Sequence, residues 1–77
     1  MEVSVAFGRA LRELRRNKGL TQEELGFEAD LRRTFVSILE LGQQQPTLQT
    51  IFKLSQALEI HPSELIKLVE NQLKVPN

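Results

Sequence analysis

Polar side chains gather on one face of a short predicted helix, residues 33–41, whose other face is apolar. The outward-facing residues are Arg33, Thr34, Ser37 and Ile38, and the inward-facing ones are Phe35, Val36 and Leu39. An arginine near the start of an exposed helix can donate two hydrogen bonds to O6 and N7 of a guanine, which gives about 1–3 kcal/mol of discrimination. The segment therefore predicts a surface that reads base pairs, with Arg33 as its main contact.

The neighbours of Arg33 carry less sequence information. Thr34 and Ser37 can donate to a base or to a phosphate. Ile38 has two interpretations, because it can meet a thymine methyl group or extend the core. Arg32 stands at the N-cap position without a capping acceptor; it contacts a base or a phosphate, or it stays a solvated charge. We include all four among the expected base contacts.

A second predicted helix, residues 21–29, lies just upstream, so residues 21–41 read as a helix-turn-helix. Gly26 predicts a close approach of the two helices, although a tolerated surface glycine is the alternative. Asp30 falls in the turn, where aspartate accepts the left-handed conformation better than most residues.

The start of this helix offers a second kind of contact. Thr21 and Glu24 have the spacing of a capping box. The free N–H groups at Thr21 and Gln22, together with the positive end of the helix dipole, favour a phosphate oxygen. A plain helix cap is the other interpretation, and the two are compatible.

Three further amphipathic segments complete an all-α pattern of five helices. They cover residues 5–18, a stretch that begins after the cap Thr47, and residues 62–73; tails are expected at 1–4 and 74–77. The inward-facing residues of the first are Phe7, Ala10, Leu11 and Leu14, and those of the second are Leu48, Ile51, Leu54, Ala57 and Leu58.

Composition limits the classes of function. Seventy-seven residues fit one small domain, 1–77, and the absence of cysteine with a single histidine argues against a metal site or another cofactor. No run approaches the ~18 apolar residues of a membrane span, so we expect a cytoplasmic protein with no membrane contact. An enzyme is not expected, because acidic pairs such as Glu23 and Glu24 need a pocket to become catalytic.

The formal net charge is zero, but the basic residues are clustered. The first helix and its end carry Arg9, Arg12, Arg15, Arg16 and Lys18. Only Glu13 opposes them, and a DNA phosphate responds to such a local patch within a Debye length of about 8–10 Å.

The last helix is apolar on more than one side. Its apolar residues include Leu65, Leu68, Val69 and Leu73. We expect these four to form a homodimer interface, which would place two recognition helices roughly 34 Å apart on a near-palindromic operator. The alternative is that all four fill the core of a monomer.

Taken together, the spacings resemble the Xre/Cro family of helix-turn-helix regulators, to which phage repressors belong. The matching residues are Leu11-Arg12-Glu13-Leu14-Arg15, Lys18-Gly19-Leu20-Thr21-Gln22-Glu23-Glu24-Leu25, Arg33-Thr34-Phe35-Val36-Ser37, Leu39-Glu40, Gly42, Pro46-Thr47-Leu48, Leu54 and Ala57-Leu58. The chain departs from the family pattern at Asp30, Arg32, Ile38 and Leu41, and in the uncharged loop 43–45.

This resemblance implies a five-helix, lambda-repressor-like DNA-binding domain, usually dimeric, with the third helix in the major groove. It implies an ion pair between Arg15 and Glu40, and it places Gln22 near the DNA backbone. We also expect Arg15, Gln43 and Gln44 to lie along that backbone.

The sequence therefore predicts a sequence-specific transcriptional regulator that binds double-stranded DNA as a homodimer, similar to a phage repressor or to a restriction-modification controller. No small-molecule effector is evident. Two alternatives remain: an antitoxin-type autorepressor, and a protein-interaction module that kept the fold and lost DNA binding, which the neutral charge and the loop 43–45 favour.

Overall fold

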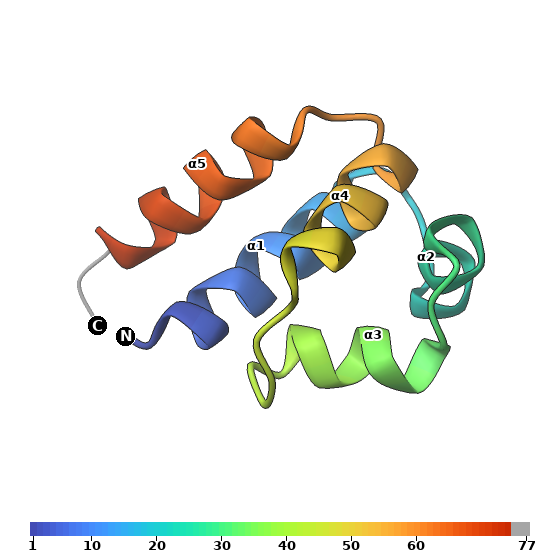
Figure 1. The fold of residues 1–77 in the computed structure, drawn as a ribbon, viewed down its shortest axis with the longest axis horizontal. Coiled ribbons are helices and arrows are strands. Elements are labelled where there is room, and N and C mark those ends of the chain that lie inside the picture. Colours follow the sequence, from blue (N-terminus) through green and yellow to red (C-terminus); the bar gives the residue numbers. More distant parts are fainter. Residues whose placement is uncertain (75–77) are drawn as a thin grey trace.

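Five helices and no strand make up the part of the chain that the structure, a computed structural model, describes, residues 1–74. In chain order they are α1 (Val3–Asn17), α2 (Gln22–Ala29), α3 (Arg33–Glu40), α4 (Leu48–Ala57) and α5 (Pro62–Leu73) (Figure 1). The predicted all-α class is confirmed. Most of the predicted C-terminal tail, residues 75–77, lies outside the described residues. Within residues 1–74 no helix combines the length and the apolar character that a membrane span needs.

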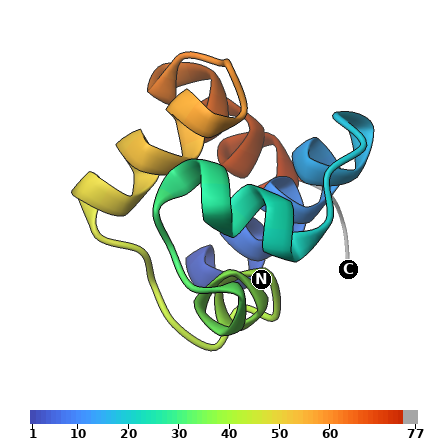
Figure 2. The same ribbon diagram turned by 90° about the vertical axis from the view of Figure 1, so that its right-hand side faces the viewer.

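α1 is the central helix of the arrangement. It packs along α5 on one side and against α3 on another, so α5 and α3 lie at opposite ends of the molecule (Figure 1). α2 packs on α3 and α4, and α4 also packs on α5. Figure 2 looks almost along the axis of α3: the end of α1 and the first turn of α2 lie on one side of it, and the loop toward α4 runs off on the other, where it meets the start of α1.

Each helix contributes an apolar stripe to a common core. The largest apolar side chains that are fully buried are Leu11, Leu25, Val36, Leu39, Leu54 and Leu65. Gly8 of α1 lies directly under the end of α3, because a Cβ atom at this position would come within 2.5 Å of the carbonyl oxygens of Leu39 and Glu40. The backbones of α1 and α3 therefore touch at this point.

α1 begins earlier than the sequence predicts. The expectation of a tail over residues 1–4 is wrong, because the N–H of Ala6 already donates to the carbonyl oxygen of Glu2 at 3.0 Å. Ala6 and Phe7 are both buried. The first turn of the helix is needed to hold both side chains in the core. The sequence pattern does not reveal this turn, because Val3 is exposed and adds no inward-facing apolar residue to it.

The buried stripe of α4 also differs from the prediction. Leu48 was expected inside, but it is 71% exposed at the first position of the helix. Thr50 and Ser55 are buried instead. Both polar side chains are satisfied: Thr50 bonds with the hydroxyl of Thr47 at 3.0 Å, and Ser55 Oγ donates to the carbonyl oxygen of Ile51 at 2.7 Å.

The turn between α2 and α3 has the predicted geometry. Asp30 is left-handed, with φ 57° and ψ 46°. A Cβ atom at Gly26 would stand 2.6 Å from the carbonyl oxygen of Leu31, so the close approach inferred from this glycine is present. The N–H of Leu31 donates to the carbonyl oxygen of Gly26 at 2.8 Å, which closes the turn.

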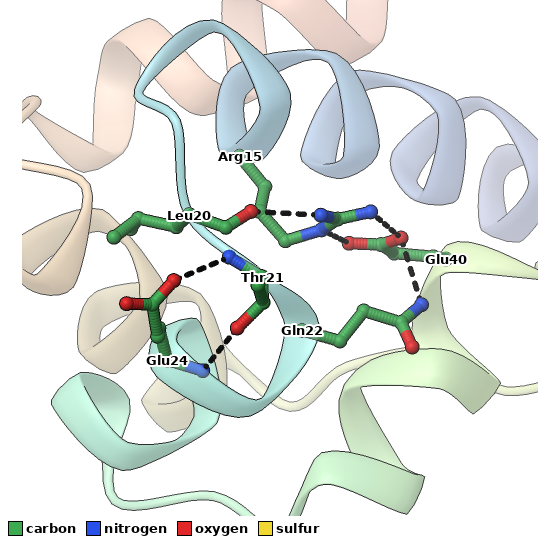
Figure 3. A network of polar contacts seen from close by, with 6 residues as sticks. All are labelled: Arg15, Leu20, Thr21, Gln22, Glu24 and Glu40. Atoms are coloured by element: carbon green, nitrogen blue, oxygen red, sulfur yellow. Dashed lines mark hydrogen bonds and ion pairs between the residues drawn. The ribbon is translucent and has the colours of Figure 1, made fainter.

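A polar network joins α1, the start of α2 and the end of α3 (Figure 3). Arg15 of α1 donates from Nε and Nη2 to the two carboxylate oxygens of Glu40 on α3, at 2.6 and 3.0 Å. Its Nη1 donates to the carbonyl oxygen of Leu20 at 2.8 Å, and Gln22 of α2 donates to Glu40 at 3.1 Å. Glu40 thus receives hydrogen bonds from two other helices.

The network is nearly removed from water, since the side chains of Arg15 and Glu40 are 12% and 3% exposed. The hydrogen bond to Glu40 raises the pKa of Arg15 above its ordinary value, so the guanidinium stays charged. A bidentate pair fixes the relative angle of its partners as well as their distance. The pair expected between Arg15 and Glu40 is therefore present, and it orders α1 against α3.

We predict that Glu40→Ala lowers the free energy of unfolding by about 3 kcal/mol, because it leaves a largely buried arginine without its partner. Urea or thermal denaturation measures this loss. Glu59→Gln is the matched control, since it breaks an exposed pair with Lys18 and should leave the transition nearly unchanged. A Glu40→Ala protein that unfolds together with the parent would contradict the assignment.

Candidate nucleic-acid interface

The outer face of α3 is polar near the start of the helix. Arg33 and Thr34 are exposed, and Ser37 and Ile38 are half-buried on the same side. On the opposite side Val36 and Leu39 are fully buried, and Phe35 packs against the core. α3 thus separates its two kinds of side chain as predicted, and its outer face points away from the other helices (Figures 1 and 2).

Two arginines stand at the start of α3 with no partner among residues 1–74. Arg32 is the N-cap residue, with extended backbone and no side-chain capping bond, and Arg33 is the first helical residue. Neither forms a salt bridge within the described part of the chain. Both guanidinium groups can therefore bind a ligand without first breaking an internal contact.

The other end of α3 leads into an uncharged loop. Gln43 and Gln44 are exposed there, next to an exposed Leu41. The N–H of Gln43 donates to the carbonyl oxygen of Ile38 at 3.1 Å, which holds the start of the loop against the helix. The loop offers amide groups to a phosphate backbone, but no charge.

At the start of α2, the capping box is formed. Thr21 Oγ1 accepts from the N–H of Glu24 at 3.0 Å, and the N–H of Thr21 donates to the Glu24 carboxylate at 2.9 Å. The backbone N–H of Thr21 is thus committed to the cap. Gln22, one residue later, keeps a free backbone N–H at the positive end of the helix, and its side chain is held in place by Glu40.

Arg15 was expected to contact the DNA backbone in addition to Glu40, and the structure argues against this second role. All three nitrogen atoms of its guanidinium are bonded within the chain. The side chain is also largely covered. Three of its five N–H groups are thus used to hold α1 against α3 and the start of α2, and little of the side chain is left accessible to a phosphate.

The dimer interface expected on α5 needs a correction. Leu65 and Val69 are buried in the core of their own chain, at 0% and 6% exposure, because this side of α5 packs on α1 and α4. They cannot be presented to a second copy. Leu68 and Leu73 remain partly exposed, and Ile66, which the prediction left out, is 48% exposed.

An apolar hollow of about 160 Å³ lies beside Ile66, between the start of α1, α4 and α5. Its lining residues are Val3, Ser4, Phe7, Gln45, Pro46, Ile51, Ile66 and Val69. Leu48 and Phe52 are exposed on the same helix as Ile51, three residues before it and one after. None of these side chains carries a charge.

Besides Phe52, a second exposed aromatic residue is absent from the sequence-based prediction. Phe27 of α2 is 84% exposed beside the turn, where it borders Gly26, Asp30 and Arg32. The sequence does contain a signal for this exposure. Phe27 lies between Glu23 and Asp30 on one side of the helix, and both of those charged residues are exposed.

Comparison with known proteins agrees with the helix-turn-helix arrangement of α2 and α3. The helix-turn-helix family model HTH_3 matches residues 11–65. The chain is 38% identical to control protein C.BamHI of Bacillus amyloliquefaciens over 65 residues, which cover 83% of this chain and 80% of that protein.

Two solved structures of controller proteins are also similar. Restriction-modification controller protein C.AhdI from Aeromonas hydrophila is 50% identical with a TM-score of 0.79, covering 80% of this chain and 94% of its own. The controller protein C.Esp1396I, solved as a tetramer in complex with its natural 35 base-pair operator, shares the fold, with a TM-score of 0.88 at 20% identity over 97% and 99% of the two chains. The chain therefore belongs to the helix-turn-helix family HTH_3, the class of fold that its resemblance to Xre/Cro regulators predicts.

Proposed function

We propose that this protein is a sequence-specific, DNA-binding transcriptional regulator of the restriction-modification controller type, which acts in the cytoplasm as a homodimer on a near-palindromic operator. The observation that carries this proposal is the outer face of α3, which is polar and exposed while its inner face is locked into the core. The similarity to C.BamHI and C.AhdI supports the controller type.

Base reading is assigned to α3. A helix of this size fits the major groove of B-DNA, and residues near its N-terminus come closest to the base edges. Arg33 is exposed at that end and donates to a guanine. Thr34 and Ser37 follow on the same face and bond with bases or phosphates, and Ile38 meets a thymine methyl group. Arg32, just outside the helix, serves an adjacent base or phosphate.

Phosphate binding is assigned to the elements on both sides of α3. On one side the start of α2 directs the N–H of Gln22 outward, with the helix dipole favouring an anion. On the other side Gln43 and Gln44 offer side-chain amides. Glu40 fixes the start of α2 relative to α3. Its carboxylate belongs to α3, accepts a hydrogen bond from the Gln22 side chain of α2 and is itself held by Arg15.

The second chain of the homodimer is proposed to bind the uncharged face formed by α4 and α5. The hollow beside Ile66 is flanked by exposed Leu48 and Phe52, so a two-fold partner can place its own apolar side chains against it. Leu73 lies seven residues after Ile66 and extends this face. Leu68 is on a different side of α5, where it borders Leu14 of α1.

An alternative function, a protein-interaction module without DNA binding, is favoured by two features of the chain. The net charge is zero, and Phe27 offers an exposed aromatic group next to the turn. We predict instead that the parent protein binds random double-stranded DNA at low salt with an affinity that falls as salt rises, because non-specific binding is electrostatic. Fluorescence anisotropy across a salt series measures this, and no binding even at the lowest salt would rule out the regulator.

We predict that Arg33→Ala weakens operator binding about 5- to 150-fold and relaxes the preferred sequence at one base position in each half-site, since one bidentate contact is lost. Selection of binding sites from random DNA, with parent and variant in parallel, shows which position changes. Lys67→Ala on α5 is the control and should select the parental motif. An unchanged motif with Arg33→Ala would show that this arginine does not read a base.

We predict that Ile66→Glu converts the dimer to a monomer, because it places a carboxylate in an uncharged contact surface. Sedimentation velocity measures the mass directly. Lys67→Glu, at the next residue and exposed, should remain dimeric, whereas Leu68→Glu tests the other side of α5. If Ile66→Glu stays dimeric while Leu68→Glu dissociates, the interface lies over α1 instead.

A further inference from the structure

We infer that Arg12 and Arg16, with a smaller share from Arg9, bind phosphates of the DNA strand that passes beside the start of α2. These residues form one stripe on α1, here called the arginine stripe. The inference rests on the proposed function, since it extends the surface by which the protein holds DNA. It assigns a binding role to the exposed side of α1, a helix whose buried side packs inside the protein.

The cations of the chain are not equally available. Arg15 is committed to Glu40, Lys18 pairs with Glu59, and Lys53 approaches Asp30 at 4.0 Å. The contact with Lys18 also lowers the pKa of Glu59 below its ordinary value. The cations that form no salt bridge within residues 1–74 are Arg9, Arg12, Arg16, Arg32, Arg33, Lys67 and Lys74.

These unpaired cations fall into three groups by position. Lys67 and Lys74 are on or just after α5, which lies across the molecule from α3 (Figure 1). Arg32 and Arg33 stand at the start of α3. The arginine stripe is the third group, and it contains the largest number of unpaired positive charges on any one helix of the described chain.

Helical spacing puts the arginine stripe on the solvent side of α1. Arg9, Arg12 and Arg16 are separated by three and four residues, so they share one face. All three are exposed, and together with Glu13 and Asn17 they line one open hollow on the surface. Ala10 and Leu14, which belong to the core side of the helix, do not interrupt this face.

The stripe adjoins the side of α1 that packs on α3. Arg15, three residues after Arg12, points to Glu40 of α3. Arg16 lies five residues before Thr21, where the capping box opens α2, and its carbonyl oxygen accepts from the N–H of Gly19 in the connecting turn. Arg12 and Arg16 are thus next to the phosphate-binding start of α2, while Arg9 is one turn farther away.

The one acidic neighbour is turned to the other side. Glu13 accepts a hydrogen bond from Gln72 of α5 at 3.4 Å, so its carboxylate is directed toward α5 and away from α3. The edge of the stripe that faces α3 therefore carries arginines and no carboxylate. On α1, an anion that approaches from the side of α3 meets arginines; the first turn of α2 adds two exposed carboxylates, Glu23 and Glu24.

The position of α3 determines which anion this is. A helix in the major groove, about 12 Å wide, has a phosphate backbone on each side of it. In Figure 2, the end of α1, which carries Arg12 and Arg16, and the first turn of α2 lie on the same side of α3, and the uncharged loop leaves toward the other side, beside the start of α1. The backbone on the first side runs past Gln22 and continues toward Arg16 and Arg12.

The slope of binding against salt tests this inference. Each phosphate contact contributes about 0.9 to the slope of log affinity against log salt. We expect the double variant Arg12→Gln/Arg16→Gln to reduce the slope by about 1.8 and to weaken binding to operator and random DNA by similar factors, about tenfold per contact near 0.1 M salt. Arg9→Gln alone should reduce it by less.

Two controls separate this effect from net charge and from folding. Lys67→Gln/Lys74→Gln removes the same number of charges from α5 and should leave the slope at the parental value. Arg12→Lys/Arg16→Lys keeps the charge and should restore the slope of the double variant. Thermal denaturation of the parent and of every variant checks that each is folded.

The outcomes are distinguishable. A parent that fails to bind DNA at low salt contradicts the proposed function itself. A parent that binds, with a double variant of equal slope, overturns this inference alone and leaves the arginine stripe free for an acidic protein segment. An equal loss of slope in the α5 control would assign the effect to net charge rather than to the arginine stripe.

Discussion

The carboxylate of Glu40 is the constraint on which the rest of the structure depends. It is nearly inaccessible to water, and a buried carboxylate is tolerated only when its oxygens are bonded. Arg15 and Gln22 supply those bonds from α1 and α2. Three helices must therefore meet at one point, and the recognition helix has little freedom to rotate relative to the start of α2. The proposed reading of bases by α3 and binding of phosphate at α2 would need this fixed relation, since both contacts must fit one duplex.

Local signals in the sequence were sufficient for the helix-turn-helix. The spacing of Thr21 and Glu24 predicts where α2 begins, and the residue type of Asp30 predicts a left-handed backbone in the turn. Both features depend on residues only a few positions apart. Arg15 and Glu40 are far apart in sequence, and nothing local couples them. Their pairing was available only through resemblance to a family, and the structure supplies its physical basis in the two hydrogen bonds and the burial of both side chains.

Features that depend on how a helix is rotated against its neighbours were not predictable in the same way. Leu48 and Leu65 are both leucines on amphipathic helices, yet one is exposed and the other is fully buried. The difference follows from the hydroxyl groups of Thr50 and Ser55, which satisfy their hydrogen bonds locally and so can enter the core in place of an apolar residue. A pattern that counts only apolar residues cannot register this substitution. On α5 the reason is different: the helix is apolar on more than one side, and the pattern does not say which side packs on α1 and α4, so Leu65 and Val69 were placed in an interface and Ile66 was left out.

A net charge of zero is a poor guide to nucleic-acid binding in a chain of this size, because the fold decides which charges remain available. Lys18 and Lys53 are directed toward acidic neighbours, and Glu13 is directed toward α5. The two ion pairs neutralise the charges of Lys18 and Lys53, and the neutral amide of Gln72 holds the Glu13 carboxylate on the α5 side of α1. The unpaired arginines that remain lie on α1 and at the start of α3, so the side of the protein that would meet DNA is basic although the whole chain is neutral. Because electrostatic attraction to phosphate is short-ranged at physiological salt, this local excess decides binding.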